Sequence, residues 1–206
     1  MDLNTITISA ETNNPEGLIV FLHGWGANAE DLASLTPLLR LTQYQFIFPD
    51  APFPHPQVPL GRAWYSLETQ EYKGLDQSRQ TLIDWLTSLE ATTGIPASRT
   101  ILGGFSQGGA MTMDVGRELG LAGLIVLSGY LHFSPEPVSG SFPPMLIVHG
   151  RLDRVVPLTA AIRARDRFGE LGADIQYHEF DMAHEIRPEV LSLIRSFVVE
   201  VMSKSA

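Results

Sequence analysis

The chain has 206 residues, of which 44% are hydrophobic and 18% are charged, and it carries a formal net charge of −9. This composition is typical of a globular protein with a sizeable core, and we expect one domain spanning residues 1–206. The negative charge argues against nucleic acids and anionic membranes as partners, because their phosphates would be repelled. The absence of cysteine excludes disulfides, thiolate metal sites and a cysteine nucleophile.

The chain shows no signs of a targeting or membrane-spanning segment. Residues 1–5 lack the basic and apolar character of a secretory signal. The longest apolar stretches, such as residues 121–131, are interrupted by Gly and Ser and are too short to cross a bilayer. With the lack of cysteine, these features predict a cytoplasmic protein without an integral membrane segment.

Strand patterns recur along the whole chain. Residues 5–10 alternate between polar and apolar types, which predicts an edge strand. Continuous apolar runs are typical of strands buried on both faces of a parallel sheet. Such strands are predicted at residues 17–22, 45–48, 124–128 and 144–149 and from Thr100 onward, and residues 175–180 alternate as a last strand.

Helical patterns fill most of the intervals between these strands. The first follows Asn28 and carries Leu32, Leu35, Leu38 and Leu39. The others are predicted at residues 75–93, from Ser106 to about residue 119, at residues 158–171 and from Pro188 onward. Alternating strands and helices predict an α/β fold with an open, mostly parallel central sheet and helices on both faces.

Residues 51–66 interrupt this alternation with many prolines followed by aromatic residues. A segment so rich in proline cannot form a regular element. It is either a linker or a loop folded over a site. Because the composition does not change on either side of it, we favour the loop.

The strand that begins at Thr100 leads into Gly104-x-Ser106-x-Gly108, which matches the G-x-S-x-G pattern of a nucleophile elbow. In that motif a serine occupies a sharp, strained turn between a strand and a helix, and the glycines let the two elements approach closely. The short pattern alone is also compatible with a structural Gly-rich turn or a phosphate-binding loop.

A serine nucleophile requires a base, and the base requires an orienting acid. After an elbow, the expected chain order is serine, acid, histidine. Asp153 and His184 each lie just after a predicted strand, so Ser106, Asp153 and His184 have the expected order. Asp181 is an alternative acid, although it shares a loop with His184. The simpler interpretations are that Asp153 is a turn or capping residue and that His184 is a surface residue.

The remaining polar residues receive no catalytic role. His23 precedes the serine in the chain and is interpreted as a loop-bracing hydrogen-bond donor. Asp114, in the helix after Ser106, has no evident function. We expect no metal site and no cofactor, because the chain has no metal-ligand spacing. The histidines interpreted as structural, or as having no identifiable partner, are His55, His132, His149 and His178.

An acyl-transfer serine also needs donors for the negative oxygen that develops during attack. One is expected from the backbone N–H of the residue after the nucleophile, Gln107. A second is expected from residues 23–26, because Gly24 and Gly26 would let the backbone approach a substrate. A phosphate loop is the alternative for this stretch, although no Gly-Lys-Ser/Thr follows it.

Several motifs together resemble the phospholipase/carboxylesterase family of the α/β-hydrolase fold, which includes acyl-protein thioesterases and small bacterial carboxylesterases. They lie at residues 21–26, 103–111, 127–129, 149–157 and 182–185, and the resemblance runs from about residue 17 to residue 200. It implies that Ser106 is the nucleophile, Asp153 the orienting acid and His184 the general base. It also implies that the backbone N–H groups of Trp25 and Gln107 form the oxyanion hole.

The resemblance further implies an acyl groove lined from the loop at residues 51–66. Ordinary packing beneath a loop is the alternative for its aromatic residues. The loop is shorter and richer in proline than is usual in the family, which leaves the acyl length and the leaving group open. The candidate substrate-binding residues are Phe53, Leu60, Trp64, Tyr65 and Val156.

We therefore expect a cofactor-independent serine carboxylesterase that hydrolyses small to medium-chain carboxylic esters through an acyl-enzyme. An acyl-thioesterase or lysophospholipase using the same triad is the alternative. The complete set of catalytic residues disfavours a non-catalytic binding protein, and the lack of length for a peptide-binding domain disfavours a peptidase or amidase. A homodimer is compatible with this site, because an apolar groove is often partly covered by a partner.

Overall fold

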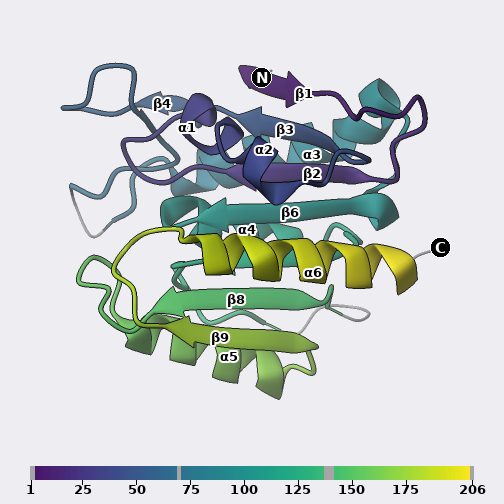
Figure 1. Ribbon diagram of the computed structural model, residues 1–206. Helices are drawn as coiled ribbons and strands as arrows, with labels where there is room; N and C mark the ends of the chain where they lie inside the picture. Colours follow the sequence, from purple (N-terminus) through teal and green to yellow (C-terminus); the bar gives the residue numbers. More distant parts are fainter. Residues whose placement is uncertain (1–2, 69–70, 137–141, 205–206) are drawn as a thin grey trace.

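A computed structural model of the protein describes residues 3–68, 71–136 and 142–204 (Figure 1). Within these residues a seven-stranded sheet has the order β1-β3-β2-β6-β7-β8-β9. Strand β1 pairs antiparallel with β3, and the other neighbouring strands are parallel. The strands are β1 (Thr5–Ile8), β2 (Leu18–Leu22), β3 (Gln45–Pro49), β6 (Thr100–Phe105), β7 (Gly123–Leu127), β8 (Met145–Gly150) and β9 (Ile175–Phe180).

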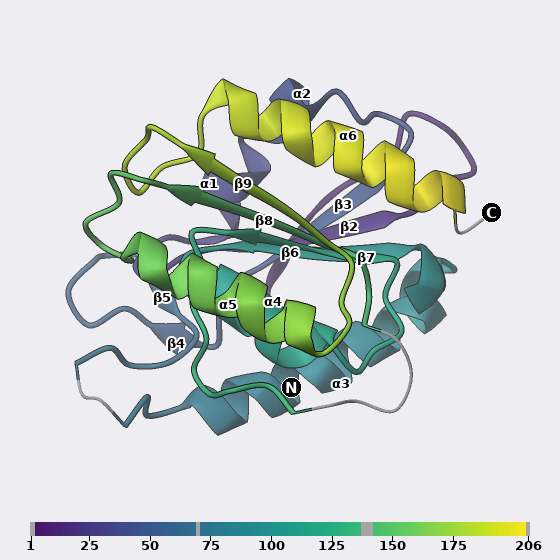
Figure 2. The same cartoon turned by 90° about the horizontal axis from the view of Figure 1, so that it is seen from below.

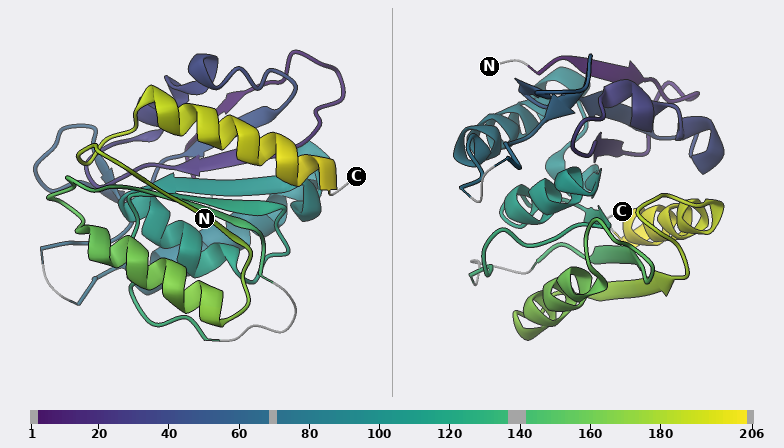
Figure 3. Two further views of the ribbon diagram at one scale, coloured as in Figure 1. Left: turned by 60° about the horizontal axis from the view of Figure 1, so that its bottom comes forward. Right: turned by 90° about the vertical axis from the view of Figure 1, so that its left-hand side faces the viewer.

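Helices cover both faces of the sheet, as the sequence predicted. Figure 2 shows α3, α4 and α5 on one face and α6 on the other, and Figure 3 shows the two layers from the left-hand side of Figure 1. Two apolar clusters fill the space between the sheet and each helix layer, which explains the continuous apolar runs of the central strands. The helices are α1 (Ala29–Ala33), α2 (Thr36–Leu39), α3 (Leu75–Thr93), α4 (Gln107–Gly116), α5 (Leu158–Glu170) and α6 (Pro188–Lys204), with a short 3₁₀ turn, η1 (Ala97–Arg99).

Two helices differ from the sequence-based expectation. The helical pattern after Asn28 forms two short helices, α1 and α2, because Pro37 lacks the N–H that a continuous helix would need and lies in the first turn of a new helix. As a result, Leu38 is exposed instead of facing the core. Helix α4 ends at Gly116, a few residues before the predicted end.

The proline-rich segment is a loop folded onto the sheet edge, as predicted, and is not a linker. It contains a small antiparallel hairpin of β4 (Phe53–Pro54) and β5 (Arg62–Ala63). The backbone of Arg62 accepts a hydrogen bond from the N–H of Gly26 at 2.9 Å and donates one to the carbonyl oxygen of Ala27 at 2.8 Å. The hairpin therefore holds the loop that follows β2.

The carboxyl ends of the parallel strands meet at one edge of the sheet, on the left in Figure 1. The loops after β2, β6, β8 and β9 all emerge at this edge. In open α/β sheets, ligands bind at this edge. The topology thus brings together residues that lie far apart in the sequence.

Candidate active site

Ser106 occupies a strained turn between β6 and α4. Its φ and ψ are 55° and −116°, in a region that side-chain-bearing residues rarely adopt. Its N–H donates a hydrogen bond to the carbonyl oxygen of Leu127 in the neighbouring strand at 2.8 Å. The turn is therefore fixed to the centre of the sheet, and Ser106 stands at the first turn of a buried helix.

The glycines on either side of Ser106 are required by close backbone approach. A Cβ added at Gly104 would lie 2.2 Å from the carbonyl oxygen of Gly108. A Cβ added at Gly108 would lie 2.1 Å from the carbonyl oxygen of Leu22 in β2. Both distances are far below van der Waals contact. The G-x-S-x-G pattern therefore has a steric basis in this chain, as a nucleophile elbow requires.

Asp153 and His184 are joined by a hydrogen bond, in which His184 Nδ1 donates to Asp153 Oδ2 at 2.7 Å. The other carboxylate oxygen, Oδ1, accepts from the backbone N–H groups of Val155 and Val156, each at 2.8 Å. Burial by itself would raise the pKa of Asp153, but the hydrogen bonds from His184, Val156 and Val155 outweigh it and lower the pKa below its usual value. Asp153 is therefore a carboxylate at neutral pH.

His184 lies beside the elbow, because its ring contacts that of Phe105 with centroids 4.7 Å apart. Asp181, the alternative acid, instead accepts a hydrogen bond from Arg151 Nη1 at 2.8 Å. Behind the predicted acid, His149 is buried, and its Nε2 donates to the carbonyl oxygen of Val156 at 2.8 Å. This bond closes the turn whose N–H groups hold Asp153.

The loop after β2 passes next to the elbow. A Cβ added at Gly24 would lie 3.3 Å from the Cβ of Ser106, so Gly24 lets the backbone come close to the nucleophile. The ring of the next residue, Trp25, packs edge-on against His55 of the proline-rich loop, with centroids 4.6 Å apart. The N–H of Trp25 therefore belongs to a loop that is braced from both sides.

His23 braces the same loop with both of its ring nitrogens. Nδ1 donates to the carbonyl oxygen of Gly24 at 2.8 Å, and Nε2 accepts from the N–H of Ala51 at 3.0 Å. Burial lowers the pKa of His23, so its imidazole is neutral. The predicted role of His23 as a hydrogen-bond donor that braces the loop is confirmed, and the structure shows that His23 also accepts a hydrogen bond.

The side chain of Gln107 has a role that the sequence did not indicate. It is fully buried; its Oε1 accepts from the N–H of Trp64, and its Nε2 donates to the carbonyl oxygen of Tyr65, both at 2.9 Å. Gln107, whose N–H is the predicted oxyanion donor, is thereby held by hydrogen bonds to the Trp64–Tyr65 peptide. Because 43 residues separate Gln107 from Trp64, no local pattern could have revealed this contact.

A groove of about 400 Å³ lies next to the loop after β2. Phe53, predicted to bind substrate, lines it together with Trp25. Leu60 is 87% exposed and is not part of the lining. The groove is lined by Trp25, Phe53, Pro54, Pro56, Ala63, Ser66, Glu68, Lys73, Gly74 and Gln77.

The other predicted groove residues lie beneath the surface. Trp64 and Tyr65 are fully buried, and Trp64 Nε1 donates to the carbonyl oxygen of His23 at 2.9 Å. They are packed beneath the loop, which is the alternative left open by the sequence. Val156 is also buried, and its backbone N–H and carbonyl oxygen bond to Asp153 and His149.

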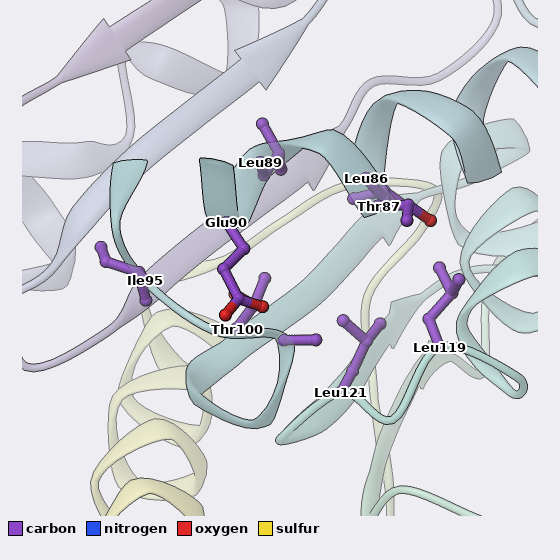
Figure 4. A pocket seen from close by; sticks show the side chains of 9 residues that line it. Leu86, Thr87, Leu89, Glu90, Ile95, Thr100, Leu119 and Leu121 are labelled. Carbon is purple, nitrogen blue, oxygen red and sulfur yellow. The ribbon is translucent and has the colours of Figure 1, made fainter. Parts of the chain in front are cut away.

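A smaller, mainly apolar cavity of about 130 Å³ lies elsewhere, between the end of α3 and the start of β6 (Figure 4). It is lined by Leu86, Leu89, Ile95 and other aliphatic side chains, with Glu90 and Thr87 also in the lining. None of the predicted site residues takes part, so this cavity is separate from the candidate active site.

Two absences apply to the part of the chain that the structure describes. Residues 3–68, 71–136 and 142–204 contain no group of three or more His, Cys, Asp or Glu arranged to hold a metal ion. Within the same ranges, no helix combines the length and the apolar character needed to cross a membrane.

The fold, together with an elbow serine beside an Asp–His pair at the carboxyl edge, defines the class of the protein: an ester hydrolase of the α/β-hydrolase fold. The chain belongs to the phospholipase/carboxylesterase family, whose model matches residues 3–202. The resemblance expected from the sequence motifs is thereby confirmed.

Known proteins similar to this chain include thioesterases and esterases. Acyl-protein thioesterase 1 of Neurospora crassa is 31% identical over 220 residues, which cover 91% of this chain and 88% of that protein. Acyl-protein thioesterase 1 homolog 2 of Dictyostelium discoideum is 33% identical over 185 residues, covering 74% of this chain and 77% of its own. The crystal structure of esterase PE8 matches with a TM-score of 0.90 at 29% identity, covering 98% of this chain and 100% of that one.

Proposed function

We propose that the protein is a serine carboxylesterase that hydrolyses small to medium-chain carboxylic esters through an acyl-enzyme. Ser106 acts as the nucleophile, His184 as the general base and Asp153 as the orienting acid. The observation that carries the proposal is the 2.7 Å Asp153–His184 hydrogen bond beside a serine in strained elbow geometry.

In the first half of the reaction, the hydroxyl oxygen of Ser106 attacks the ester carbonyl carbon while His184 takes the hydroxyl proton. Asp153 accepts the hydrogen bond from Nδ1, which leaves Nε2 as the basic nitrogen, and its negative charge stabilises the imidazolium that forms. His184 then gives the proton to the departing alkoxide, and the acyl group stays on Ser106.

The negative oxygen of the tetrahedral intermediate is stabilised by the backbone N–H groups of Trp25 and Gln107. Donors fixed before the reaction stabilise this charge without reorganising during the step. The rigid surroundings of both residues support this role: Gln107 is held through its side chain, and the loop of Trp25 is held by the β4–β5 hairpin and His23. In the second half, His184 activates a water molecule that releases the acid and restores Ser106.

The groove beside Trp25 accommodates the substrate. Ser106, His184 and Gln107 are not part of its lining. Trp25 connects it to the proposed site, because its N–H is a proposed oxyanion donor and the residue lines the groove. Phe53 and the prolines of β4 and its loop offer apolar surface, whereas Glu68 and Lys73 add charges to the lining. This volume lies in the range of small-molecule binding sites.

A thioester substrate is the second candidate, favoured by the names of the relatives that are acyl-protein thioesterases. Attack on a thioester uses the same nucleophile, base and oxyanion donors, so the site geometry supports both substrates equally. Lysophospholipids are accessible to the same machinery. The cytoplasmic location and the homodimer stay predictions from the sequence.

The function is tested with p-nitrophenyl esters from acetate to palmitate and with S-acyl thioesters of the same chain lengths. Ser106→Ala is expected to lower kcat by at least about 10⁴-fold, because loss of a nucleophilic serine removes the acyl-enzyme route. The control is Ser88→Ala, at an exposed position on α3. The ratio of kcat/KM for ester and thioester at equal chain length decides between the two candidates. Equal activity of Ser106→Ala and wild type would contradict the proposal.

A further inference from the structure

Asp114 and His132, which have no explanation in the sequence, are partners in the structure. His132 Nδ1 donates to Asp114 Oδ2 at 2.7 Å; the His132 side chain is fully buried, and that of Asp114 is 14% exposed. Asp114 lies on α4, and His132 lies in the segment after β7. Neither residue takes part in the proposed mechanism, so the buried pair has a role that the triad and the oxyanion hole do not explain.

Three tyrosines enclose the His132 ring. The centroids of Tyr65, Tyr72 and Tyr130 lie 4.7, 5.3 and 5.5 Å from that of His132, and each ring is close to perpendicular to it. The hydroxyl groups of Tyr65 and Tyr130 are hydrogen-bonded to each other. Burial raises the pKa of Tyr130 to about 12 and raises that of Tyr65 well above its usual value, so both phenols are protonated at neutral pH. We call Tyr65, Tyr72, Asp114, Tyr130 and His132 the His132 cluster.

The orientation of His132 depends on Asp114. Among the residues that the structure describes, Nε2 of His132 is buried and has no hydrogen-bond partner, so the bond at Nδ1 is the polar contact that orients the ring. The guanidinium group of Arg79 also lies near the Asp114 carboxylate, with Nε 3.7 Å from Oδ2, and adds a positive charge beside the pair.

The His132 cluster is connected to the proposed oxyanion hole through Tyr65. The ring of Tyr65 packs against His132, and the backbone carbonyl oxygen of the same residue accepts the hydrogen bond from Gln107 Nε2 at 2.9 Å. Helix α4 is thus attached to the Trp64–Tyr65 peptide at two points. Gln107, the first residue of the helix, bonds to the peptide directly. Farther along the helix, Asp114 bonds to His132, which packs against the ring of Tyr65.

We propose that Asp114 and His132 are positioning residues for the oxyanion hole. They hold the ring of Tyr65, and Tyr65 in turn fixes the peptide that clamps Gln107, so that the N–H of Gln107 stays aligned with the developing oxyanion. The inference rests on the proposed function of Ser106. Removing an oxyanion donor lowers kcat by about 10²–10³-fold, and small displacements at a reacting centre also have large effects. Loss of a positioning residue is therefore expected to lower kcat by about 10-fold.

The experiment compares His132→Phe, Asp114→Ala and Asp114→Asn. The first keeps an aromatic ring and loses the bond to Asp114; the second removes the acceptor; the third keeps an oxygen that accepts from Nδ1. We expect the first two to lower kcat about 10-fold with KM within about twofold of wild type, and Asp114→Asn to retain most of the activity. Titration with a fluorophosphonate counts the intact nucleophiles, so that kcat is expressed per active site.

A second readout reports the oxyanion hole itself. A trifluoromethyl ketone forms a tetrahedral adduct with the serine, and its oxygen binds where the oxyanion binds. Its Ki is expected to rise by the same factor by which kcat/KM falls, because the adduct resembles the transition state. The matched control is Phe168→Leu, which lowers stability by changing a fully buried α5 residue. Among the described residues, its ring contact is with Phe142 and not with a ring of the His132 cluster.

The outcomes separate this inference from the proposed function. Unchanged kcat per active site in His132→Phe and Asp114→Ala, or an effect on KM alone, would mean that the His132 cluster only stabilises the fold. Activity that persists in Ser106→Ala would overturn the proposed function and this inference together. If His132→Phe does not fold, Asp114→Ala measured against Asp114→Asn provides the same comparison of kcat and KM.

Discussion

His23 shows how a single buried residue fixes the loop beside the nucleophile. Its ring is neutral, with the proton on Nδ1 bonded to Gly24 and the lone pair on Nε2 bonded to the N–H of Ala51. Adding a proton to Nε2 would break the second bond and bury a charge. The loop that carries Trp25 should therefore be sensitive to acid through His23.

Lowering the pH should destabilise the protein through His23. Because burial lowers the pKa of His23 from 6.5, the unfolded chain binds more protons than the folded protein as the pH falls below that value. The free energy of unfolding should fall from about pH 6.5 downward and level off below the lowered pKa. Urea unfolding between about pH 5 and pH 8 measures this slope, which should be smaller in His23→Gln. Equal slopes in the two proteins would contradict it.

Asp153 acts in a different pH window, which keeps the two effects apart. Its folded-state pKa lies below the ordinary value of 3.8, so its contribution to stability is present above that value and is lost as the pH falls through the lowered pKa. The measurement on His23→Gln stays above this window.

At the scale of elements, α4 approaches β2 so closely that the helix and the strand share no room for side chains at their contact. Gly108 lies on the first turn of α4 directly against Leu22, whereas Gly169 in α5 has no atom within 4 Å of an added Cβ. The same substitution should therefore have opposite effects in the two helices.

We predict that Gly108→Ala destabilises the protein by more than about 3 kcal/mol, because its methyl group would overlap the Leu22 backbone. Gly169→Ala should stabilise it by about 0.5–1 kcal/mol, since alanine loses less backbone entropy in a helix. Denaturant unfolding of both variants checks the pair. A tolerated Gly108→Ala would mean that α4 is free to move away from β2.

The elements were predictable where the signal was local, and the misses have physical causes. Apolar runs identified the central strands, because burial on both faces requires them. The leucine spacing around Pro37 suggested one helix, since periodicity does not register the missing N–H of proline. Trp64 looked like a groove residue, but its polar atoms are satisfied by Gln107, His23 and Ser78, which are distant in sequence. The Asp114–His132 pair joins a helix to a later segment and left no pattern at all.

At the scale of the whole molecule, charge affects which substrates approach readily. The chain has 14 basic and 23 acidic side chains, giving a net charge of −9. A field of this sign slows the approach of anionic molecules and has no effect on neutral ones. The field therefore does not affect an uncharged ester, but it slows the approach of a thioester that is attached to an anionic carrier group.

Salt should therefore affect anionic and uncharged thioester substrates differently. For an acyl-coenzyme A, kcat/KM should rise about threefold between low salt and about 0.3 M salt, because added ions screen the repulsion. For an uncharged thioester of the same acyl chain, it should stay constant. Steady-state kinetics over this salt range tests the prediction. Equal salt dependence for both substrates would mean that the field at the groove does not follow the net charge.

The sheet order also has a consequence for how activity arises during folding. Strand β2 pairs with β6 in the register Leu18 to Thr100, and residues of the loops after β8 and β9 complete the Asp–His pair. The elbow spans a short segment, but the residues that fix it and the Asp–His pair come from strands whose pairing closes long stretches of chain, and such pairing is slow. Recovery of hydrolysis after dilution from denaturant therefore reports the last strand pairings, while helix content reports earlier, local events.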